Sequence, residues 1–385
     1  MLRMIPAPGV FLAGVAVFLL VAWDAFEVII LPRRVTRKLR IARVYYRASW
    51  ACWKFCTRLL GPGKMRESFL GFYGPISMLF LIGYWAVGLV FSFGLMQYGA
   101  GSAVNLTGKT PSFYTDLYLS GTTFFTLGLG DVVPRSGLAR VLVVAEAGFG
   151  FGFLAAMIGY LPFIYGAFSS RETNITLLDA RAGTPPTAGE LLRRHSYPTG
   201  HEALRDLLKD WERWCAELLE SHLSYPVLAY FRSQHDNQSW IGSLTAILDT
   251  CALTIAGIED SCAKQAELTF AIARHAVVDL CQVFSAAPRL PKTDRLPRET
   301  LEKLRSKLAQ HGMMLSATPE AEQKLLELRR MYEPYVYALA NHLSQTLPPW
   351  TPEKKGKDNW QTTAWAQTAG VMDKKAVTVI RDDHF

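Results

Sequence analysis

Three long apolar runs in the first 170 residues constrain the fold of this chain more than any other feature. The first covers residues 9–23 and, beyond Asp24 and Glu27, residues 28–31; the others cover residues 69–96 and 141–168. A helix over residues 8–31 would be about 36 Å long, which is enough to cross a bilayer. Because lipid offers no hydrogen-bond partners, a crossing segment must satisfy its backbone internally, as a helix does. We therefore predict an all-α membrane protein with three transmembrane helices.

The first apolar run could also be a secretory signal, so two interpretations compete. The residues before it carry only Arg3, and no Ala-x-Ala cleavage pattern follows it. These features favour a retained transmembrane helix. Asp24 and Glu27 lie one helical turn apart near its end. We expect them to pair with the arginines within residues 33–37 rather than to form a proton site.

A short stretch between the second and third runs, residues 123–131, has the sequence TFFTLGLGD. It is too short to span a bilayer. Glycine allows successive carbonyls to take positions that would strain other residues. A row of carbonyls that point one way can replace the water shell of a cation. Non-helical backbone at membrane depth is tolerated where it lines a cavity or is buried in protein, so we predict a re-entrant loop that coordinates an ion. The alternative is a glycine-rich turn between two helices.

The pattern Thr-x-x-Thr-x-Gly-x-Gly-Asp resembles the signature of the potassium-channel pore-loop superfamily, over roughly residues 112–168. The resemblance implies a short pore helix over residues 112–125, whose negative C-terminal end faces the ion, followed by a selectivity filter for K⁺. It implies ion-binding carbonyls on Thr126, Leu127, Gly128, Leu129 and Gly130. Supporting side chains are expected at Thr123, Asp131 and Glu146. For Glu146, a buried structural carboxyl is favoured over a proton relay.

The filter also predicts how many chains assemble. One strand of carbonyls cannot encircle an ion, whereas four strands in closed symmetry can, so a homotetramer is expected. The resembled family usually has Tyr or Phe between the two filter glycines, and this chain has Leu129. Selectivity for potassium over other monovalent cations therefore stays open.

The third apolar run carries possible gate or hinge positions. Gly148, Gly150 and Gly152 alternate with phenylalanines, and Pro162 follows ten residues later. Three closely spaced glycines weaken a helix, which favours a hinge; close packing against the pore helix explains them equally well. Pro162 is expected to kink the helix.

The net charge of +8 is concentrated in one loop, because residues 33–67 hold 11 basic residues and one acidic residue. Short basic loops stay cytoplasmic, which places the N-terminus outside the cell (inner or plasma) membrane and the C-terminal part in the cytoplasm. The cations repeat at helical spacing, which predicts an interfacial helix on anionic lipid headgroups. The expected headgroup contacts are Arg40, Arg43, Arg47, Lys54 and Arg58, and the expected apolar contacts are Ile41, Val44, Trp50 and Phe55. Because the excess positive charge lies next to the membrane, nucleic-acid binding is rejected. Voltage sensing is not supported either, because these arginines lie outside any predicted transmembrane helix.

The distribution of apolar runs and charged residues divides the chain into five parts. Residues 1–67 form a transmembrane helix and a basic interfacial helix, and residues 68–169 form the pore domain. Residues 170–198 are a linker, residues 199–346 a soluble all-α cytoplasmic domain, and residues 347–385 a disordered tail. The cytoplasmic domain shows apolar stripes at helical spacing but no nucleotide-binding glycine motif. Its histidines lack metal-ligand spacing, and no catalytic constellation is visible, so neither an enzyme nor an organic cofactor is predicted.

We therefore predict a homotetrameric potassium-selective ion channel whose cytoplasmic domain serves gating or assembly. A nonselective monovalent cation channel on the same fold is the first alternative. A non-conducting, membrane-tethered scaffold is the second. The sequence names neither the gating stimulus nor a ligand of the cytoplasmic domain.

Overall fold

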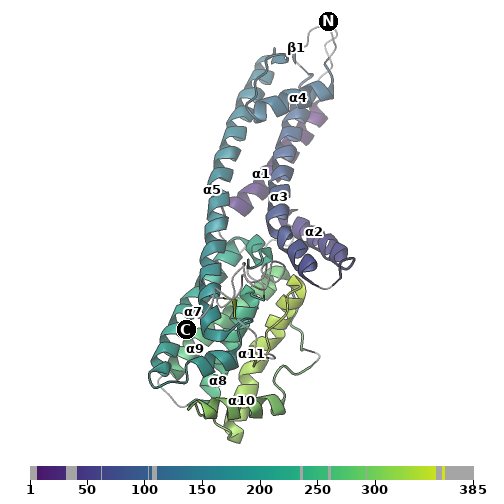
Figure 1. The fold of residues 1–385 in the computed structure, drawn as a ribbon. Coiled ribbons are helices and arrows are strands. Elements are labelled where there is room, and N and C mark those ends of the chain that lie inside the picture. The colour runs from purple at the N-terminus through teal and green to yellow at the C-terminus, as the bar shows by residue number, and fades with distance from the viewer. Residues whose placement is uncertain are drawn as a thin grey trace, which may run out of the picture. The chain divides into compact units, whose positions relative to one another are not determined.

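The computed structural model describes residues 7–31, 41–61, 63–102, 104–105, 111–234, 237–258, 262–291, 293–352 and 358–359. The chain divides into two compact units, Met1–Gly166 and Ala167–Phe385. Both units are built from helices, as the sequence predicts (Figure 1).

Unit 1 holds the apolar helices. Its elements are α1 (Pro8–Ile29), α2 (Ile41–Thr57), α3 (Lys64–Gly99), α4 (Phe113–Phe124) and the first part of α5 (Gly137–Ala182). Helices α1, α3 and α5 contain the three predicted apolar runs, and each is long and apolar enough to cross a membrane. Two short strands, β1 (Val104–Asn105) and β2 (Val133–Pro134), pair antiparallel on either side of α4, which the sequence did not indicate.

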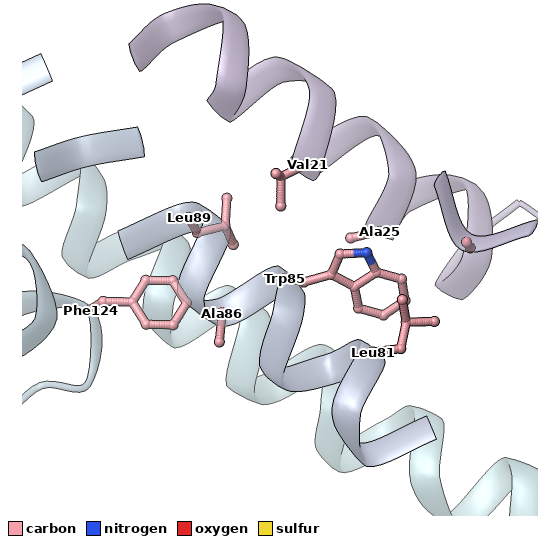
Figure 2. Packing of buried hydrophobic residues seen from close by; sticks show 8 residues of the cluster. Val21, Ala25, Leu81, Trp85, Ala86, Leu89 and Phe124 are labelled. Atoms are coloured by element: carbon pink, nitrogen blue, oxygen red, sulfur yellow. The ribbon is translucent and has the colours of Figure 1, made fainter. Parts of the chain in front are cut away.

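Helices α1 and α3 pack closely because small residues remove the side chains between them. A Cβ on Gly14 would lie 2.8 Å from the Ser92 carbonyl oxygen, and one on Gly99 would lie 2.4 Å from the Phe11 nitrogen. Further along, Val21 and Ala25 of α1 face the Trp85 side of α3 in one buried cluster (Figure 2). Close backbone approach at glycines is a general device for packing helices in membranes.

Asp24 connects three helices of unit 1. It lies on α1 and is 4% exposed. Its Oδ1 accepts from the backbone N–H of Ala42 in the first turn of α2 (3.1 Å). Its Oδ2 accepts from the indole N–H of Trp85 on α3 (2.9 Å). The partners that the sequence suggested for Asp24, the arginines within residues 33–37, lie outside the described residues.

Unit 2 is an all-α domain around one buried helix. Its elements are the last part of α5, then α6 (Ala188–Arg194), α7 (Gly200–Ser224), the 3₁₀ turn η1 (Pro226–Tyr230), α8 (Trp240–Gly257), α9 (Ala263–Phe284), α10 (Arg298–Gln310) and α11 (Pro319–Leu343). Helix α8 is apolar enough to qualify as a membrane span, but 89% of its apolar window is buried. It is the core helix of this unit.

The predicted linker, residues 170–198, is instead ordered helix and packed turn. Helix α5 continues to Ala182, and α6 follows from Ala188. Arg171 is 4% exposed, and its guanidinium donates to the carbonyls of Leu228 (2.9 Å) and Phe231 (2.7 Å). The polar residues after the apolar run mark the end of high hydropathy, not the end of the helix.

The predicted tail is also wrong in its first part. Trp350 is 1% exposed, and its carbonyl accepts from the N–H of Gly189 (2.9 Å). Asp358 pairs with Arg194 (2.6 Å) and accepts from the N–H of Thr184 (3.1 Å). These contacts fasten the segment to α6 and to the turn after α5. Residues 360–385 lie outside the described residues.

Candidate ion-conduction site

The helix α4 ends at the loop that carries the ion-binding prediction. It begins after Ser112, whose N–H donates to the Thr115 hydroxyl (3.2 Å) as part of a capping box. Its last residue is Phe124, two positions before Thr126. A helix of this length does not span a bilayer, and its C-terminal end carries the negative end of the helix dipole. The predicted short helix before the loop is therefore present.

The backbone of the loop alternates in handedness. The φ angles of Thr126, Gly128 and Gly130 are +58°, +56° and +78°, while Leu127 and Leu129 between them are not in this region. In an ordinary strand, successive carbonyls point to opposite sides. Positive φ at every second residue therefore distinguishes this loop from an ordinary strand.

Thr126 is unusual within this pattern because it is β-branched. A left-handed conformation costs roughly 1–2 kcal/mol for a residue with a side chain, and glycine avoids that cost. Non-glycine residues held in such conformations cluster at functional sites. The strained residue therefore coincides with the first predicted ion ligand.

Carbonyls of the last turn of α4 hold the loop. The N–H of Thr126 donates to the Thr123 carbonyl (3.0 Å), which fits the supporting position predicted for Thr123. The N–H of Leu127 donates to the Thr122 carbonyl (2.7 Å). Thr122 was missed in the sequence, where no spacing signal separates it from its neighbour. Both leucine side chains of the loop are largely exposed, Leu127 by 62% and Leu129 by 63%.

Asp131 ends the loop and contacts the helix before it. Its Oδ2 accepts from the hydroxyl of Tyr118 on α4 (3.1 Å), and both side chains are exposed. After Asp131, the chain pairs with the segment that precedes α4 through β2 and β1. Tyr118 was not singled out in the sequence. The contact links the end of the loop to the middle of α4.

Glu146 lies behind the pore helix. It belongs to α5, is 0% exposed, and its Oε1 contacts the hydroxyl of Ser120 on α4. The Ser120 hydroxyl also lies 2.7 Å from the Val90 carbonyl of α3. Ser120 of α4 therefore contacts both Val90 of α3 and Glu146 of α5, and the structural role of Glu146 stays a prediction. Ser120, the centre of this contact, was missed because one serine in a helix gives no distinctive signal.

The glycine triplet of α5 divides into two classes. A Cβ on Gly150 would lie 2.2 Å from the Phe124 carbonyl oxygen, so this position is needed for packing against α4. A Cβ on Gly148 or on Gly152 would have no neighbouring atom within 4 Å. Helix α5 is continuous through the triplet and through Pro162. Close packing accounts for Gly150, and the gating roles of Gly148, Gly152 and Pro162 stay predictions.

The predicted headgroup contacts fall on or beside α2. Arg43, Arg47 and Lys54 are on this helix, and Arg58 is in the turn that follows it. Arg40 lies outside the described residues. Trp50, which the sequence suggested as a lipid contact, is 3% exposed and packs toward α3, with its ring centroid 4.7 Å from that of Tyr73. Within the described ranges, no group of three or more histidine, cysteine or acidic side chains is placed to hold a metal ion.

Comparison with known proteins agrees with this geometry. Residues 77–162 match a family model described as an ion channel. This segment is therefore similar to the pore-loop superfamily of ion channels. The match runs from α3 through α4 and the loop to α5, so it contains the loop and the parts of α3 and α5 that contact α4, but not α2.

A curated relative extends the similarity without naming an activity. The chain is 26% identical over 209 residues to a protein of Bacillus subtilis (strain 168) described as "Uncharacterized membrane protein YdjJ". The match covers 53% of this chain and 58% of the relative, so the chain spans little more than half of that protein's length. No solved structure matches the chain.

Proposed function

We propose that this protein is a homotetrameric, potassium-selective ion channel in the cell membrane. The observation that carries the proposal is the alternating left-handed backbone at Thr126, Gly128 and Gly130, directly after the C-terminal end of α4. A row of aligned carbonyls can replace the hydration shell of a dehydrated cation, and we assign this role to the loop. The ion-channel family match over the same residues supports the proposal.

The proposed tetramer follows from how much of an ion one chain can surround. Each chain supplies one strand of carbonyls, which covers one side of an ion. Four chains around a closed symmetry axis would surround it. The exposure of Leu127 and Leu129 supports this, because adjacent copies would bury large apolar side chains that one chain leaves in contact with solvent.

Orientation and the role of unit 2 complete the proposal. The basic segment between α1 and α3 favours a cytoplasmic location for that segment, an outside N-terminus and a cytoplasmic unit 2. Because α5 runs from the pore unit into unit 2 as one continuous helix, a change in unit 2 has a direct covalent route to the pore. We assign unit 2 to gating or to assembly.

A nonselective monovalent cation channel is the second candidate. Leu129 favours it, because this position usually holds Tyr or Phe in potassium channels and leucine offers neither a ring nor a hydroxyl to brace the loop. The two candidates share the backbone geometry. They differ in how rigidly the loop holds its carbonyls at the radius of K⁺, and ion selectivity measures this difference.

The deciding experiment is reconstitution of the full chain in planar bilayers with potassium on one side and sodium on the other. At equal concentrations of the two salts, potassium selectivity predicts a reversal potential far from zero, with the sign that opposes potassium flow, and a nonselective pore predicts one near zero. Absence of current from tetrameric protein would favour a non-conducting scaffold. A conducting monomer or dimer would contradict the assembly.

A paired substitution tests whether the loop itself conducts. Gly128→Ala places a methyl group on a residue at φ +56°, where alanine is strained although no atom lies within 4 Å. We expect loss of current with assembly retained. The matched control is Gly71→Ala on α3, which also has no atom within 4 Å but has ordinary helical backbone. Normal current in Gly128→Ala would remove the ion-coordinating role of the loop.

A further inference from the structure

Helix α2 has one face that is fixed to the rest of unit 1. The Tyr45 hydroxyl donates to the Ser77 carbonyl (2.7 Å), and the Ser49 and Tyr73 hydroxyls lie 2.9 Å apart. The Trp53 ring stacks on Phe69 with 4.5 Å between centroids. These contacts place one side of α2 along the first half of α3. The orientation of the opposite side is therefore set by the fold.

The opposite face carries an exposed apolar stripe. Val44 is 54% exposed and Phe55 is 63% exposed. Residues three, four or seven positions apart share one side of a helix. The stripe consists of Val44, Ala48, Ala51, Cys52 and Phe55, with Leu59 in the turn beyond the helix. It is exposed along the full length of α2, in contrast to Trp50 on the fixed side.

Cations follow the stripe, and α2 contains no acidic residue. Arg47 and Arg58 are exposed, and Arg43 and Lys54 are partly covered. The Lys54 ammonium lies 5.8 Å from the centre of the Trp50 ring, which keeps its stem along the helix. An apolar stripe bordered by positive charge matches the boundary between lipid tails and anionic headgroups.

The position of α2 in the chain identifies that partner. The helix lies between α1 and α3, both long enough to span a bilayer. Exposed apolar residues also occur on the segments that flank α2, at Ile30 after α1 and at Phe72 on α3. Asp24 of α1 accepts from the first turn of α2 and so fixes where the helix begins. An exposed apolar stripe between two helices that are long and apolar enough to span a bilayer matches a position at the bilayer surface.

We propose that the stripe face of α2 docks on the anionic lipid surface of the bilayer, with Arg47 and Arg58 on lipid phosphates and Phe55 among the acyl chains. This face selects anionic over zwitterionic lipid. Each cation close to an anionic membrane surface strengthens binding roughly fivefold. The assignment is independent of which ion the pore conducts, because it uses no residue of the filter.

The native cysteines provide the probe. Cys52 and Cys56 of α2 are exposed, and the other four cysteines are buried. The full chain is labelled there with a fluorophore and reconstituted in phosphatidylcholine vesicles that contain a small fraction of headgroup spin-labelled lipid. The spin label is carried either by phosphatidylglycerol or by phosphatidylcholine at the same fraction. Fluorescence quenching then reports which lipid is enriched beside α2.

We expect stronger quenching by the anionic lipid. In Arg47→Gln/Arg58→Gln, the preference for phosphatidylglycerol should fall by roughly fivefold for each charge removed. The matched control is Arg135→Gln/Arg140→Gln, which removes two exposed arginines of unit 1 away from α2 and should leave the preference unchanged. Equal quenching by both lipids in the unsubstituted protein would overturn the proposal. Absence of quenching by either lipid would mean that protein, such as a second copy of this chain, covers the face, and would overturn it as well.

Discussion

The two units satisfy their buried acidic groups in different ways. In unit 1, Asp24 accepts from a backbone N–H and an indole, and Glu146 contacts the Ser120 hydroxyl. In unit 2, buried carboxylates meet guanidiniums. The pairs are Asp249 with Arg295 (2.7 Å), Glu333 with Arg329 (3.2 Å) and Glu190 with Arg193 (2.6 Å). Asp24 and Glu146 therefore have neutral partners, whereas Asp249, Glu333 and Glu190 have charged partners.

The difference follows from the cost of removing charge from water. A buried ion pair requires two desolvated charges, and each costs several kcal/mol even after relaxation of the protein. Within a bilayer, a neutral donor satisfies a carboxyl group without a second charge. Unit 2 keeps several of its pairs near the surface, where the arginines retain partial contact with water. Loss of one partner leaves the other charge buried and unpaired, so these pairs should be more sensitive to substitution of one member.

The largest expected effect is in unit 2, at Arg295. Its guanidinium contacts Asp249, Glu333 and the Pro348 carbonyl, and Asp249 is 0% exposed. Arg295→Met leaves a buried carboxylate without its cation, so unfolding free energy should fall by about 3–5 kcal/mol. Denaturant unfolding followed by tryptophan fluorescence measures the loss. Lys303→Met is the control, because its pair with Glu299 is mostly exposed and should contribute little to stability. Equal effects of the two substitutions would contradict the comparison.

The sequence predicts the pore unit better than unit 2. The lengths of the apolar runs alone identify α1, α3 and α5. Within lipid, such a segment satisfies its backbone hydrogen bonds internally by forming a helix. The loop was found because its glycine spacing is strict. Ser120 and Thr122 were missed because their roles depend on which helices α4 contacts, and no local pattern encodes that.

Unit 2 was harder to predict because the structure of some of its segments depends on contacts between residues that are far apart in the sequence. The stop signals for α5 are Gly183 and the prolines after it, but the loss of hydropathy after Phe168 suggested an earlier end. The segment around Trp350 has the composition of a tail. It is ordered because the guanidiniums of Arg295 and Arg329 each lie 5.6 Å from the Trp350 ring. Composition cannot show a pairing between residues more than 20 positions apart.

A second expected effect is a pH dependence in unit 2. Burial would raise the pKa of Glu190, but hydrogen bonds from Arg193 and Arg194 outweigh it and lower this pKa to about 2. A carboxyl with a lowered folded-state pKa stabilises the fold above its ordinary value of 4.5 and loses that contribution as pH falls toward 2. Unfolding free energy should therefore decline over this window, by less than the loss in Arg295→Met. In Glu190→Gln the decline should be shallower, and an unchanged pH profile would refute the assignment.

A smaller effect is expected at Asp24 in unit 1. Asp24→Asn replaces one acceptor oxygen with an amide NH₂ that must face either the Ala42 N–H or the Trp85 indole. One buried donor then lacks its acceptor, which costs about 1–3 kcal/mol. Thermal unfolding in detergent, followed by size-exclusion chromatography, should show a lower midpoint. Asp131→Asn is the control, because its single contact with Tyr118 is exposed. A midpoint shift as large as that of Arg295→Met would contradict the distinction between neutral and charged partners.

The smallest effect is expected at Glu146, and it tests the neutral half of the comparison most directly. The Ser120 hydroxyl has one proton but two neighbouring acceptors, the Val90 carbonyl and the Glu146 carboxyl. Both contacts are satisfied when Ser120 donates to Val90 and a protonated Glu146 donates to Ser120. Glutamine can make the same donation without a charge, so Glu146→Gln should change stability by less than about 1 kcal/mol and preserve conduction. Glu146→Leu removes the donor and should destabilise more. If Glu146→Gln costs as much as Glu146→Leu, the carboxyl is held as an anion, and the contrast between the units fails at this residue.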